Sequence, residues 1–238
     1  MKKPTVIHPH TPIILPNWSA PARIKSLFTT KLHDPHATQT LAEYLPNTAD
    51  FERIIDPVRL HQTHSAIVHR VEEKAQGLIG DALVSSTINV PCSIEVADCV
   101  PVLLSSENGK EIAAIHAGWR GLLAGVIKNT TETMATPPSK IKAWIGPAIS
   151  ESFYPVGDDL RQPFCRKTPG YRTFFKERKN KIYFDIRGAV KYSLEAIGVF
   201  NISQTSRCVY KESESFFSFR REKTKERMIA IIWISDKP

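Results

Sequence analysis

Apolar residues fall mainly into short runs that are separated by glycine, proline, asparagine or clusters of polar residues. Short runs of this kind, rich in β-branched and aromatic side chains, are typical of β-strands. The pattern therefore predicts strands over these segments: Ile24–Thr29, Val58–Leu60, Ala66–Val71, Ala82–Val84, Cys92–Ala97, Val100–Leu104, Glu111–His116, Ile141–Ile145, Lys181–Phe184, Arg207–Tyr210, Ser215–Phe219 and Met228–Ile234.

Two segments, Gly121–Met134 and Asp185–Ile197, instead carry apolar residues at the spacing of one helical face. In the second segment Asp185 is suited to cap the N-terminus, and Gly198 follows the last helical residue. Strands outnumber helices, and several are joined by turns of hairpin length. The pattern therefore predicts the α/β (α+β) class, with a mixed rather than a purely parallel sheet.

The chain of 238 residues contains no internal repeat and no linker rich in glycine or serine. Single α/β domains often run past about 200 residues, so we expect one domain over residues 1–238. Residues 1–22 are rich in proline and are expected to form an extended arm that leads into the first strand. Residues 31–50 are polar and are expected to form a loop with one helical turn.

Neither a membrane span nor an export signal is expected. The longest apolar run, Met228–Ile234, has seven residues, whereas a membrane-spanning helix needs about 20. Prolines and histidines interrupt the region in which a signal peptide would carry its apolar core. The four cysteines, Cys92, Cys99, Cys165 and Cys208, are scattered, which favours reduced thiols in the cytoplasm.

The net charge is +8, and much of it lies in two basic runs, Lys176–Lys181 and Arg220–Arg227. Such runs can bind nucleic acid or phosphate-bearing substrates. Glutamates are interleaved in both runs, and no RNA- or DNA-binding motif accompanies them. We therefore interpret most of this charge as a solvated face and expect no nucleic-acid partner.

A cysteine and a histidine are brought together by a predicted hairpin. Asn108-Gly109 lies between two apolar runs, and this dipeptide is the strongest short hairpin signal. A two-residue turn here pairs Pro101 with His116 and makes Cys99 and His116 diagonal neighbours on one face of the sheet. A thiolate and an imidazole in these positions could converge on one zinc ion.

A third metal ligand could come from segment 60–69, which holds His61, His64 and His69. One cysteine and two histidines with a fourth position open is the arrangement of a catalytic zinc site, because a closed structural site takes four protein ligands. The H-E-x-x-H and H-x-E…P-C-x-x-C motifs are absent, which excludes the common zinc hydrolases and zinc deaminases.

The residues after His116 favour an anion near this pair. They form a tight connection, Ala117–Gly121, from a predicted strand into a predicted helix. Such a connection presents side chains at the edge of the sheet, and a helix start favours anions. Arg120 lies in this connection and adds a fixed positive charge.

A series of short motifs runs in order along the chain and resembles that of one family. The motifs are Gln62-Thr63-His64-Ser65, Gly80-Asp81-Ala82-Leu83, Ala97-Asp98-Cys99-Val100-Pro101-Val102, the AAIHAGWRG segment of residues 113–121, Gly146-Pro147-Ala148-Ile149, Tyr154-Pro155-Val156-Gly157, Arg207-Cys208-Val209-Tyr210 and Phe216-Phe217-Ser218-Phe219-Arg220-Arg221. The series resembles the YfiH-like proteins, also called the laccase-domain, polyphenol oxidase or DUF152 family. It spans about residues 24–235, nearly the whole chain.

The resemblance implies a fold and a metal site. The fold is a single-domain mixed β-sheet sandwich with flanking helices, similar to the catalytic domain of cytotoxic necrotising factor toxins. The family's metal ligands fall on His64, Cys99 and His116. The cofactor implied is Zn²⁺, with copper as the other candidate.

The resemblance also implies a purine nucleoside enzyme, which phosphorolyses adenosine, inosine and methylthioadenosine and deaminates adenosine. Its partners would be a small-molecule nucleoside and phosphate, and the chain would be a monomer or a weak homo-oligomer. Phosphate requires cationic donors such as Arg120 together with Arg220 or Arg221. Trp119 either stacks on the base or belongs to the core, and Asp81 completes the expected substrate-binding residues.

Two other functions stay open at this point. A copper-dependent polyphenol oxidase would use the same three ligands in an electron-transfer site, usually with an axial methionine. A Cys99–His116 amide hydrolase that edits cell-wall precursors would use Cys99 as a nucleophile instead of a ligand. The chain departs from the family pattern at Lys31–Pro35 and at Thr224–Met228, two regions that we expect to line the substrate pocket.

The choice of the third ligand gives a test. On a strand, His61 and His69 have the parity opposite to that of His64, and the family pattern places the ligand directly before Ser65. We predict that His64→Ala loses bound zinc and turnover together, whereas His61→Ala and His69→Ala keep both. Metal analysis and activity assays check this, and a full equivalent of metal with normal turnover in His64→Ala would contradict the three-ligand site.

Overall fold

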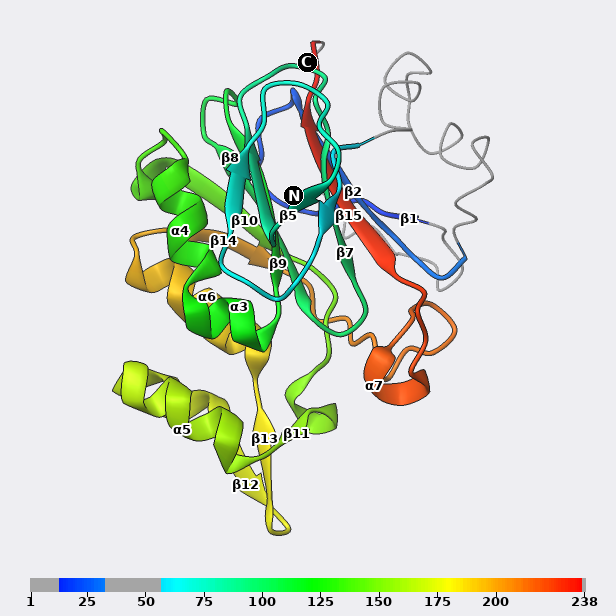
Figure 1. The fold of residues 1–238 in the computed structure, drawn as a ribbon, viewed down its shortest axis with the longest axis vertical. Helices are drawn as coiled ribbons and strands as arrows, with labels where there is room; N and C mark the ends of the chain where they lie inside the picture. Colours follow the sequence, from blue (N-terminus) through cyan, green and yellow to red (C-terminus); the bar gives the residue numbers. More distant parts are fainter. Residues whose placement is uncertain (1–12, 33–56, 237–238) are drawn as a thin grey trace, which may run out of the picture.

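Two large β-sheets pack face to face, and helices cover the outer face of one of them (Figure 1). The computed structural model describes residues 13–32 and 57–236. The predicted arm therefore falls largely outside the described residues, as does most of the predicted loop at 31–50 and of the departure at Lys31–Pro35. Layers of this kind bury the apolar face of each element against another element.

The larger sheet has six strands and is mixed, as predicted. Most neighbours are antiparallel, but β10 pairs with β14, and β4 with β6, in parallel. The order across the sheet is β14 (Asn201–Gln204), β10 (Ile141–Ile145), β8 (Val100–Ser106), β9 (Ile112–Ala117), β6 (Ala82–Ser85) and β4 (Val68–Arg70).

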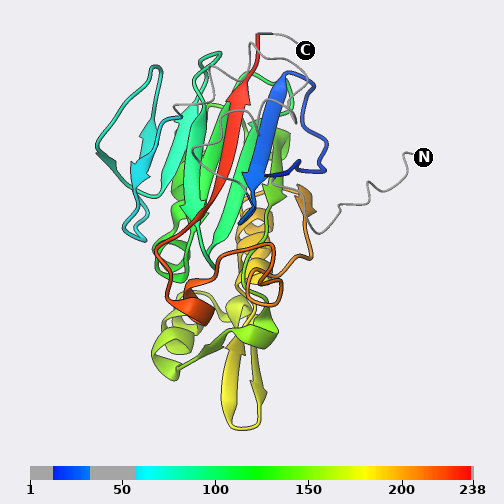
Figure 2. The ribbon, with the colours of Figure 1, turned by 90° about the vertical axis from the view of Figure 1, so that its right-hand side faces the viewer.

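The second sheet is antiparallel and lies toward the viewer in Figure 2. Its order is β1 (Ile13–Ile14), β2 (Ile24–Thr29), β15 (Met228–Ile234) and β7 (Cys92–Val96). Strands β7 and β15 contact β8 and β9 of the larger sheet. Phe28, Leu104, Ile115 and Ile232 are wholly buried, so the core lies between the two sheets and under the helices.

Helices α3 (Trp119–Ala124), α4 (Val126–Thr133) and α6 (Ile186–Ala196) pack on the larger sheet. The prediction of one helix over Gly121–Met134 is wrong, because the segment forms two helices that meet at Gly125. Gly125 has a φ of +103° and donates its N–H to the carbonyls of Gly121 and Leu122, which ends α3. Glycine reaches this backbone conformation at little cost, and it lets the chain change direction.

The second predicted helix is confirmed as α6. The Asp185 side chain accepts a hydrogen bond from the N–H of Gly188, so it caps the N-terminus as expected. Gly198 follows the end of the helix with a φ of +93° and donates its N–H to the carbonyl of Glu195. Both signals were local, which explains why the sequence alone identified them.

A smaller lobe extends from the sandwich and carries the first basic run (Figures 1 and 2). It contains β11 (Pro155–Val156), α5 (Asp158–Lys167), β12 (Phe175–Arg178) and β13 (Lys181–Phe184), with short 3₁₀ helices at Glu151–Phe153 and Pro169–Phe174. Outside this lobe lie a third 3₁₀ helix at Pro138–Lys140, the pair β3 (Leu60–His61) and β5 (Leu78–Ile79), and α7 (Phe219–Glu222).

Most predicted strands are present, but two are not. Arg207–Tyr210 and Ser215–Phe219 lie in a packed loop, where Cys208 forms only an isolated bridge with Ala148. The Glu212 carboxylate accepts hydrogen bonds from the Arg207 guanidinium and from the Cys208 N–H, which bends this loop. The aromatic residues of this loop are interspersed with polar ones as they would be in a strand, which explains the wrong prediction. Strands β12 and β14 were missed because they are short and largely polar.

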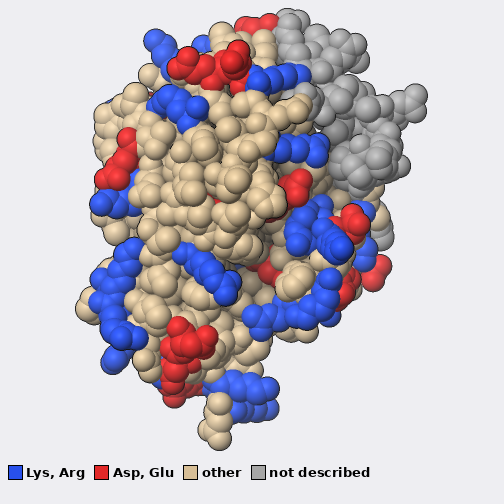
Figure 3. All heavy atoms as spheres, viewed as in Figure 1, with Lys and Arg blue, Asp and Glu red and all other residues tan. Residues whose placement is uncertain are grey.

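The first basic run is paired with acids, as expected for a solvated face. Lys176 and Arg178 form ion pairs with Glu151, and Arg161 forms one with Glu177. Figure 3 shows basic and acidic side chains adjoining one another on this lobe. In the part of the chain that the structure describes, no helix is long and apolar enough to cross a bilayer.

A buried carboxylate fixes the end of α4 to the start of β9. Glu111 is 4% exposed and accepts hydrogen bonds from the Arg70 guanidinium, from the N–H of Ala135 and from the N–H and hydroxyl of Thr136. Burial alone would raise the pKa of the Glu111 carboxyl, but the hydrogen bonds from Ala135, Arg70 and Thr136 outweigh it. Its pKa therefore lies below the usual value.

We predict that Glu111→Gln lowers the free energy of unfolding by about 1–3 kcal/mol at pH 7, the cost of leaving donors around a buried site unsatisfied. Because the folded-state pKa is depressed, the contribution is present above the unfolded-state pKa and is lost as the pH falls through the folded-state pKa. The difference from wild type should therefore shrink in acid.

Urea denaturation at pH 7 and in acid measures this difference. The matched control is Glu107→Gln, which removes a carboxylate that is 46% exposed and paired with Lys140. Exposed pairs contribute about 0–1 kcal/mol, so the control should stay close to wild type. Equal losses in the two variants would contradict the anchoring role of Glu111.

Candidate metal centre

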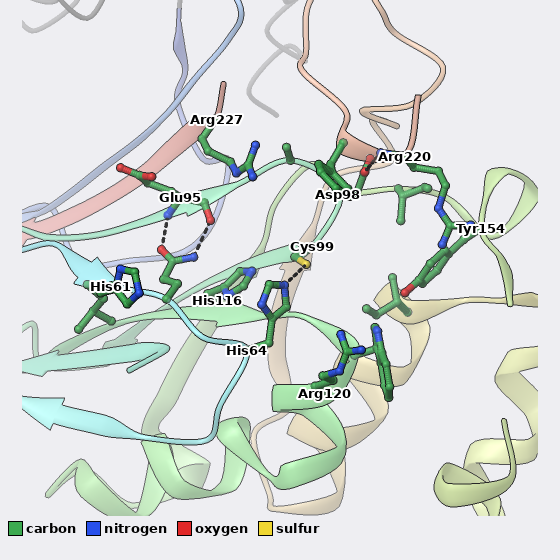
Figure 4. Close-up of a pocket in the computed structure, with 17 residues that line it drawn as sticks. His61, His64, Glu95, Asp98, Cys99, His116, Arg120, Tyr154, Arg220 and Arg227 are labelled. Carbon is green, nitrogen blue, oxygen red and sulfur yellow. Dashed lines mark hydrogen bonds between the residues drawn. The ribbon is translucent and has the colours of Figure 1, made fainter. Parts of the chain in front are cut away.

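Three side chains from separate parts of the chain converge on one point (Figure 4). One ligand atom each from His64, Cys99 and His116 lies within 4.8 Å of the other two. The predicted register is confirmed, since Pro101 pairs with His116 and Val100 with Ala117. This register puts Cys99 and His116 on the same face of the β8–β9 hairpin.

The turn that sets this register is longer than the predicted two residues. Ser106 donates its N–H to the carbonyl of Glu111, so the loop comprises the four residues 107–110. Gly109 has a φ of +69° and donates its N–H to the Ser106 carbonyl. The positive φ explains why glycine is suited to this position, and the pairing beyond the turn is unchanged.

His64 reaches the site from a loop and not from a strand. Strand β3 ends at His61, and His64 has a φ of +60°. The parity argument between these two histidines therefore does not apply, and His61 also lines the cavity described below. His69 points elsewhere, since its Nε2 lies 2.9 Å from the carbonyl oxygen of Ile79.

Asp81 holds in place the parts of the chain that carry His64 and His116. It is wholly buried, and its carboxylate accepts hydrogen bonds from the N–H groups of Thr63, His64 and Ser65 and from the Ser65 hydroxyl. Burial alone would raise the pKa of the Asp81 carboxyl, but hydrogen bonds from His116 and Ser65 hold it far below its usual range. Asp81 does not line the cavity, so the structure gives it a positioning role.

Asp81 also fixes the orientation of the His116 ring. Its Oδ1 lies 2.7 Å from Nδ1 of His116, which leaves Nε2 as the ring nitrogen available to a metal. A carboxylate behind a histidine ligand is a common feature of metal sites, because it holds the ring and increases its basicity. Burial would lower the pKa of His116, but the neighbouring Cys99 thiolate and Asp81 carboxylate raise it to about 9.

Cys99 is ionised near neutral pH. Its Sγ lies 3.7 Å from Nε2 of His64. Burial would raise the pKa of this thiol, but the charge and hydrogen bond of His116, together with those of His64, lower it to about 6. A thiolate is the form of cysteine that binds metals.

These residues fit a bound metal ion. A thiolate and two imidazole nitrogens form a donor set that zinc and copper both accept, and three protein ligands leave a position open. A cation bound here would balance the negative charge of the Cys99 thiolate, and metal binding to thiolate and imidazole ligands releases protons. Among the residues that the structure describes, this is the group with metal-ligand geometry.

The ligands lie in a cavity of about 520 Å³ (Figure 4). It lies between the start of β8 and the end of β9 on one side and α7 on the other. Its walls are charged and aromatic as well as apolar. Besides the three ligands, the residues that line it include His61, Glu95, Asp98, Trp119, Arg120, Ile149, Tyr154, Phe219, Arg220 and Arg227.

Two of the three predicted arginines line the cavity. The guanidinium of Arg120 lies 4.3 Å from the centre of the Trp119 ring, and that of Arg220 lies 5.1 Å from the centre of the Tyr154 ring. Arg221 does not line the cavity. It donates to the carbonyls of Val209, Tyr210 and Phe216 and so holds the packed loop together.

Several cavity residues were not predicted. Asp98 and Tyr154 lie in motifs that the sequence does show, but nothing in the sequence alone indicates that their side chains reach the site. Arg227 falls within the altered segment Thr224–Met228, which was expected to line the pocket. Glu95 could not have been recognised, since it is a single charged residue in a short, mostly apolar strand.

Gly118 permits the close approach of two ligands. A Cβ at this position would lie 2.7 Å from Cδ2 of His64 and 3.1 Å from Sγ of Cys99. We predict that Gly118→Ala displaces the His64 ring and reduces metal affinity by about 10- to 100-fold, an effect like that of changing a residue that supports a metal ligand. Titration of the metal-free protein with zinc measures this loss.

Gly157→Ala is the matched control. Both glycines are N-caps with an extended backbone, with φ values of −71° for Gly118 and −95° for Gly157. At Gly157 an added Cβ meets chiefly the end of the exposed Asp159 side chain, which can move. Unchanged zinc affinity in Gly118→Ala, or an equal loss in the control, would contradict the steric argument.

Comparison with known proteins shows the family of the chain. The family model described as "Multi-copper polyphenol oxidoreductase laccase" matches residues 33–235. The chain is 33% identical to the Escherichia coli protein named "Purine nucleoside phosphorylase YfiH", over 93% of this chain and 98% of that protein. It is 30% identical to a Haemophilus influenzae protein named purine nucleoside phosphorylase, over 92% and 98% of the two chains.

Solved structures give the same result. A Neisseria meningitidis protein of the DUF152 family superposes with a TM-score of 0.83 at 32% identity, covering 94% of this chain and 99% of that one. YlmD from Geobacillus stearothermophilus superposes with a TM-score of 0.73 at 26% identity, covering 90% and 93%. The sandwich fold, the ligand cluster and these matches together place the chain in the YfiH-like laccase-domain (DUF152) family.

Proposed function

We propose that the chain is a zinc-dependent purine nucleoside phosphorylase that also deaminates adenosine. The observation that carries the proposal is the convergence of His64, Cys99 and His116 in a cavity of about 520 Å³ that two arginines also line. The names of the relatives support the coarser part, an enzyme of the purine nucleoside phosphorylase type. Its partners would be a nucleoside and phosphate.

Phosphorolysis needs a bound phosphate that attacks C1′ of the ribose. The new C1′–O bond forms as the bond from C1′ to the purine nitrogen breaks, and the electron pair of that bond leaves with the base. Arg120 and Arg220 are suited to hold the phosphate, because hydrogen bonds from guanidinium groups to phosphate are strong. In the described part of the chain, Arg120 forms no ion pair with a carboxylate, and its side chain is exposed.

The metal ligands would hold zinc, which when bound supplies Lewis acidity. The chain's own contribution is to present the ligands in fixed positions. Asp81 engages Nδ1 of His116 and the backbone N–H of His64, so it fixes the orientation of the His116 ring and the backbone from which the His64 side chain extends. Tyr154 adds a neutral donor, since burial, followed by the charge of Cys99, raises the pKa of its hydroxyl far above neutrality.

The copper oxidase is less well supported by the described residues. Met134 and Met228, the two methionines that the structure describes, are buried and do not line the cavity. Neither is therefore placed as the axial ligand of an electron-transfer copper site. An amide hydrolase would need Cys99 free of metal, so metal analysis of the purified protein separates it from the proposal.

The experiment that tests the proposal uses metal-analysed protein and adenosine, with and without phosphate. Adenine released only when phosphate is present supports phosphorolysis, and inosine formed without phosphate supports deamination. Chelation followed by re-addition of zinc should abolish and restore both. Full turnover of metal-free protein, or no release of either product, would overturn the proposed function.

The arginines that line the cavity give a second test of the proposed function. Arg120→Ala should lower the kcat/KM for phosphate by about 10- to 100-fold. This range corresponds to the loss of a hydrogen bond to a charged group, which contributes about 1.5–3 kcal/mol. Metal content should not change. Arg161→Ala is the control, since Arg161 pairs with Asp158 and Glu177 and lies outside the cavity. An unchanged dependence on phosphate in Arg120→Ala would exclude an anion site at this residue.

A further inference from the structure

The residue next to the cysteine ligand has an unusual backbone conformation. Asp98 lies in the turn between β7 and β8, directly before Cys99, and has a φ of +101°. Aspartate and asparagine adopt the left-handed region near +60° more readily than other side chains do, but +101° lies outside that region, and a residue held in a sparsely populated conformation costs about 1–3 kcal/mol. Such strain persists when neighbouring contacts hold the residue in place, and it is often found at functional sites.

Contacts of this kind surround Asp98. Its Oδ1 accepts a hydrogen bond of 2.7 Å from the Ser218 hydroxyl, and its Oδ2 accepts one of 2.6 Å from the N–H of Arg220. Its backbone carbonyl accepts a third, of 3.0 Å, from the N–H of Ile149. One residue therefore joins the metal-ligand turn, the start of α7 and the segment after β10.

The partners of Asp98 carry much of the cavity wall. Arg220 on α7 lines the cavity (Figure 4), and so do its neighbour Phe219 and Ile149. Ser218 is the N-cap of α7, so the Asp98 carboxylate holds this helix at its first residues. The Asp98 carboxylate thus fixes the backbone of Arg220, while the Pro155 carbonyl, which accepts from the guanidinium, and the Tyr154 ring hold the end of its side chain.

The α7 segment is held together without Asp98. The Glu222 carboxylate accepts from the N–H of Ser218, and the Ser218 hydroxyl accepts from the N–H of Arg221. The Arg221 guanidinium binds the loop before α7, as described above. Loss of the Asp98 carboxylate would therefore leave α7 formed but free to move relative to the metal ligands.

We propose that Asp98 is a positioning residue. Its carboxylate sets the distance between the turn that carries Cys99 and the side of the cavity that Arg220 lines. Asp98 also lines the cavity, but in this role it acts through its hydrogen bonds to α7. It acts through Arg220 on the binding of the anionic substrate. The kinetic part of this inference rests on the proposed phosphorolysis.

Three variants separate positioning from folding. Asp98→Gly removes the carboxylate but suits the positive φ, so strain is relieved. Asp98→Asn keeps a side chain of the same shape that tolerates this backbone and can still accept from the N–H of Arg220. Ser218→Ala removes one of the two hydrogen bonds to the Asp98 carboxylate, together with the acceptor for the N–H of Arg221.

The expected result is a selective loss of phosphate binding. Asp98→Gly should raise the KM for phosphate by about 10- to 100-fold, with a smaller change in kcat and with metal content equal to wild type. Ser218→Ala should show a smaller rise, and Asp98→Asn should stay within about threefold of wild type. Glu111→Gln, which is destabilised at a site outside the cavity, should keep the wild-type KM.

Hydrogen exchange gives a readout that does not depend on the enzymatic activity. The N–H of Arg220 is bonded to Asp98, so the peptide that spans residues 216–224 should exchange at least about tenfold faster in Asp98→Gly than in wild type. Peptides from β8 and β9 should exchange as in wild type.

The hydrogen-exchange and kinetic measurements can each contradict the proposal separately. Unchanged exchange in residues 216–224 of Asp98→Gly overturns the positioning role, and so does an unchanged KM for phosphate in an active enzyme. Loss of metal together with the rise in KM also overturns it, because the effect would then act on Cys99. A wild-type protein without phosphorolysis defeats the proposed function, while the exchange measurement still decides the role of Asp98.

Discussion

The buried carboxylate of Asp81 is the interaction on which the site depends. A wholly buried charge is costly unless its lone pairs are satisfied, and here the N–H groups of residues 63–65, the Ser65 hydroxyl and the His116 ring do so. The same bonds hold His64 in a left-handed conformation and turn the His116 ring. One desolvated group thus converts two distant histidines into a preorganised pair of ligands.

Around this group the fold supplies two kinds of support. The β8–β9 hairpin provides a rigid register, which puts Cys99 and His116 on one face. Loops provide further walls, and two of them are joined to the sandwich by a carboxylate: residues 63–65 by the buried Asp81 and α7 by the half-buried Asp98. This division explains how a sandwich of ordinary apolar strands can carry a cavity with charged and aromatic walls.

The sequence allowed the prediction of those parts of the site that local chemistry determines. Apolar runs on either side of Asn108-Gly109 set the hairpin register, and Asp185 with Gly198 delimits α6, so both could be predicted. The role of Asp81 could not, because it depends on a loop at residues 63–65 whose conformation is itself set by Asp81. The parity argument for His64 failed for the same reason.

Other errors have separate causes. Gly125 ended one helix and began another, and helical periodicity continues across such a break. Arg221 resembled a phosphate ligand in sequence, yet its guanidinium is occupied by backbone carbonyls. Charge in a sequence indicates which side chains could bind an anion, but only the fold decides which of them remain available.

The ionised state of Cys99 has a consequence for the lifetime of the protein. A thiolate that is partly accessible is the form of cysteine that peroxides oxidise, first to a sulfenic acid. Reversal of that step usually needs a second thiol, and among the described residues no other cysteine lines the cavity. A thiol from outside the protein would then have to reduce the sulfenic acid, and a metal bound to the sulfur would shield it from the peroxide.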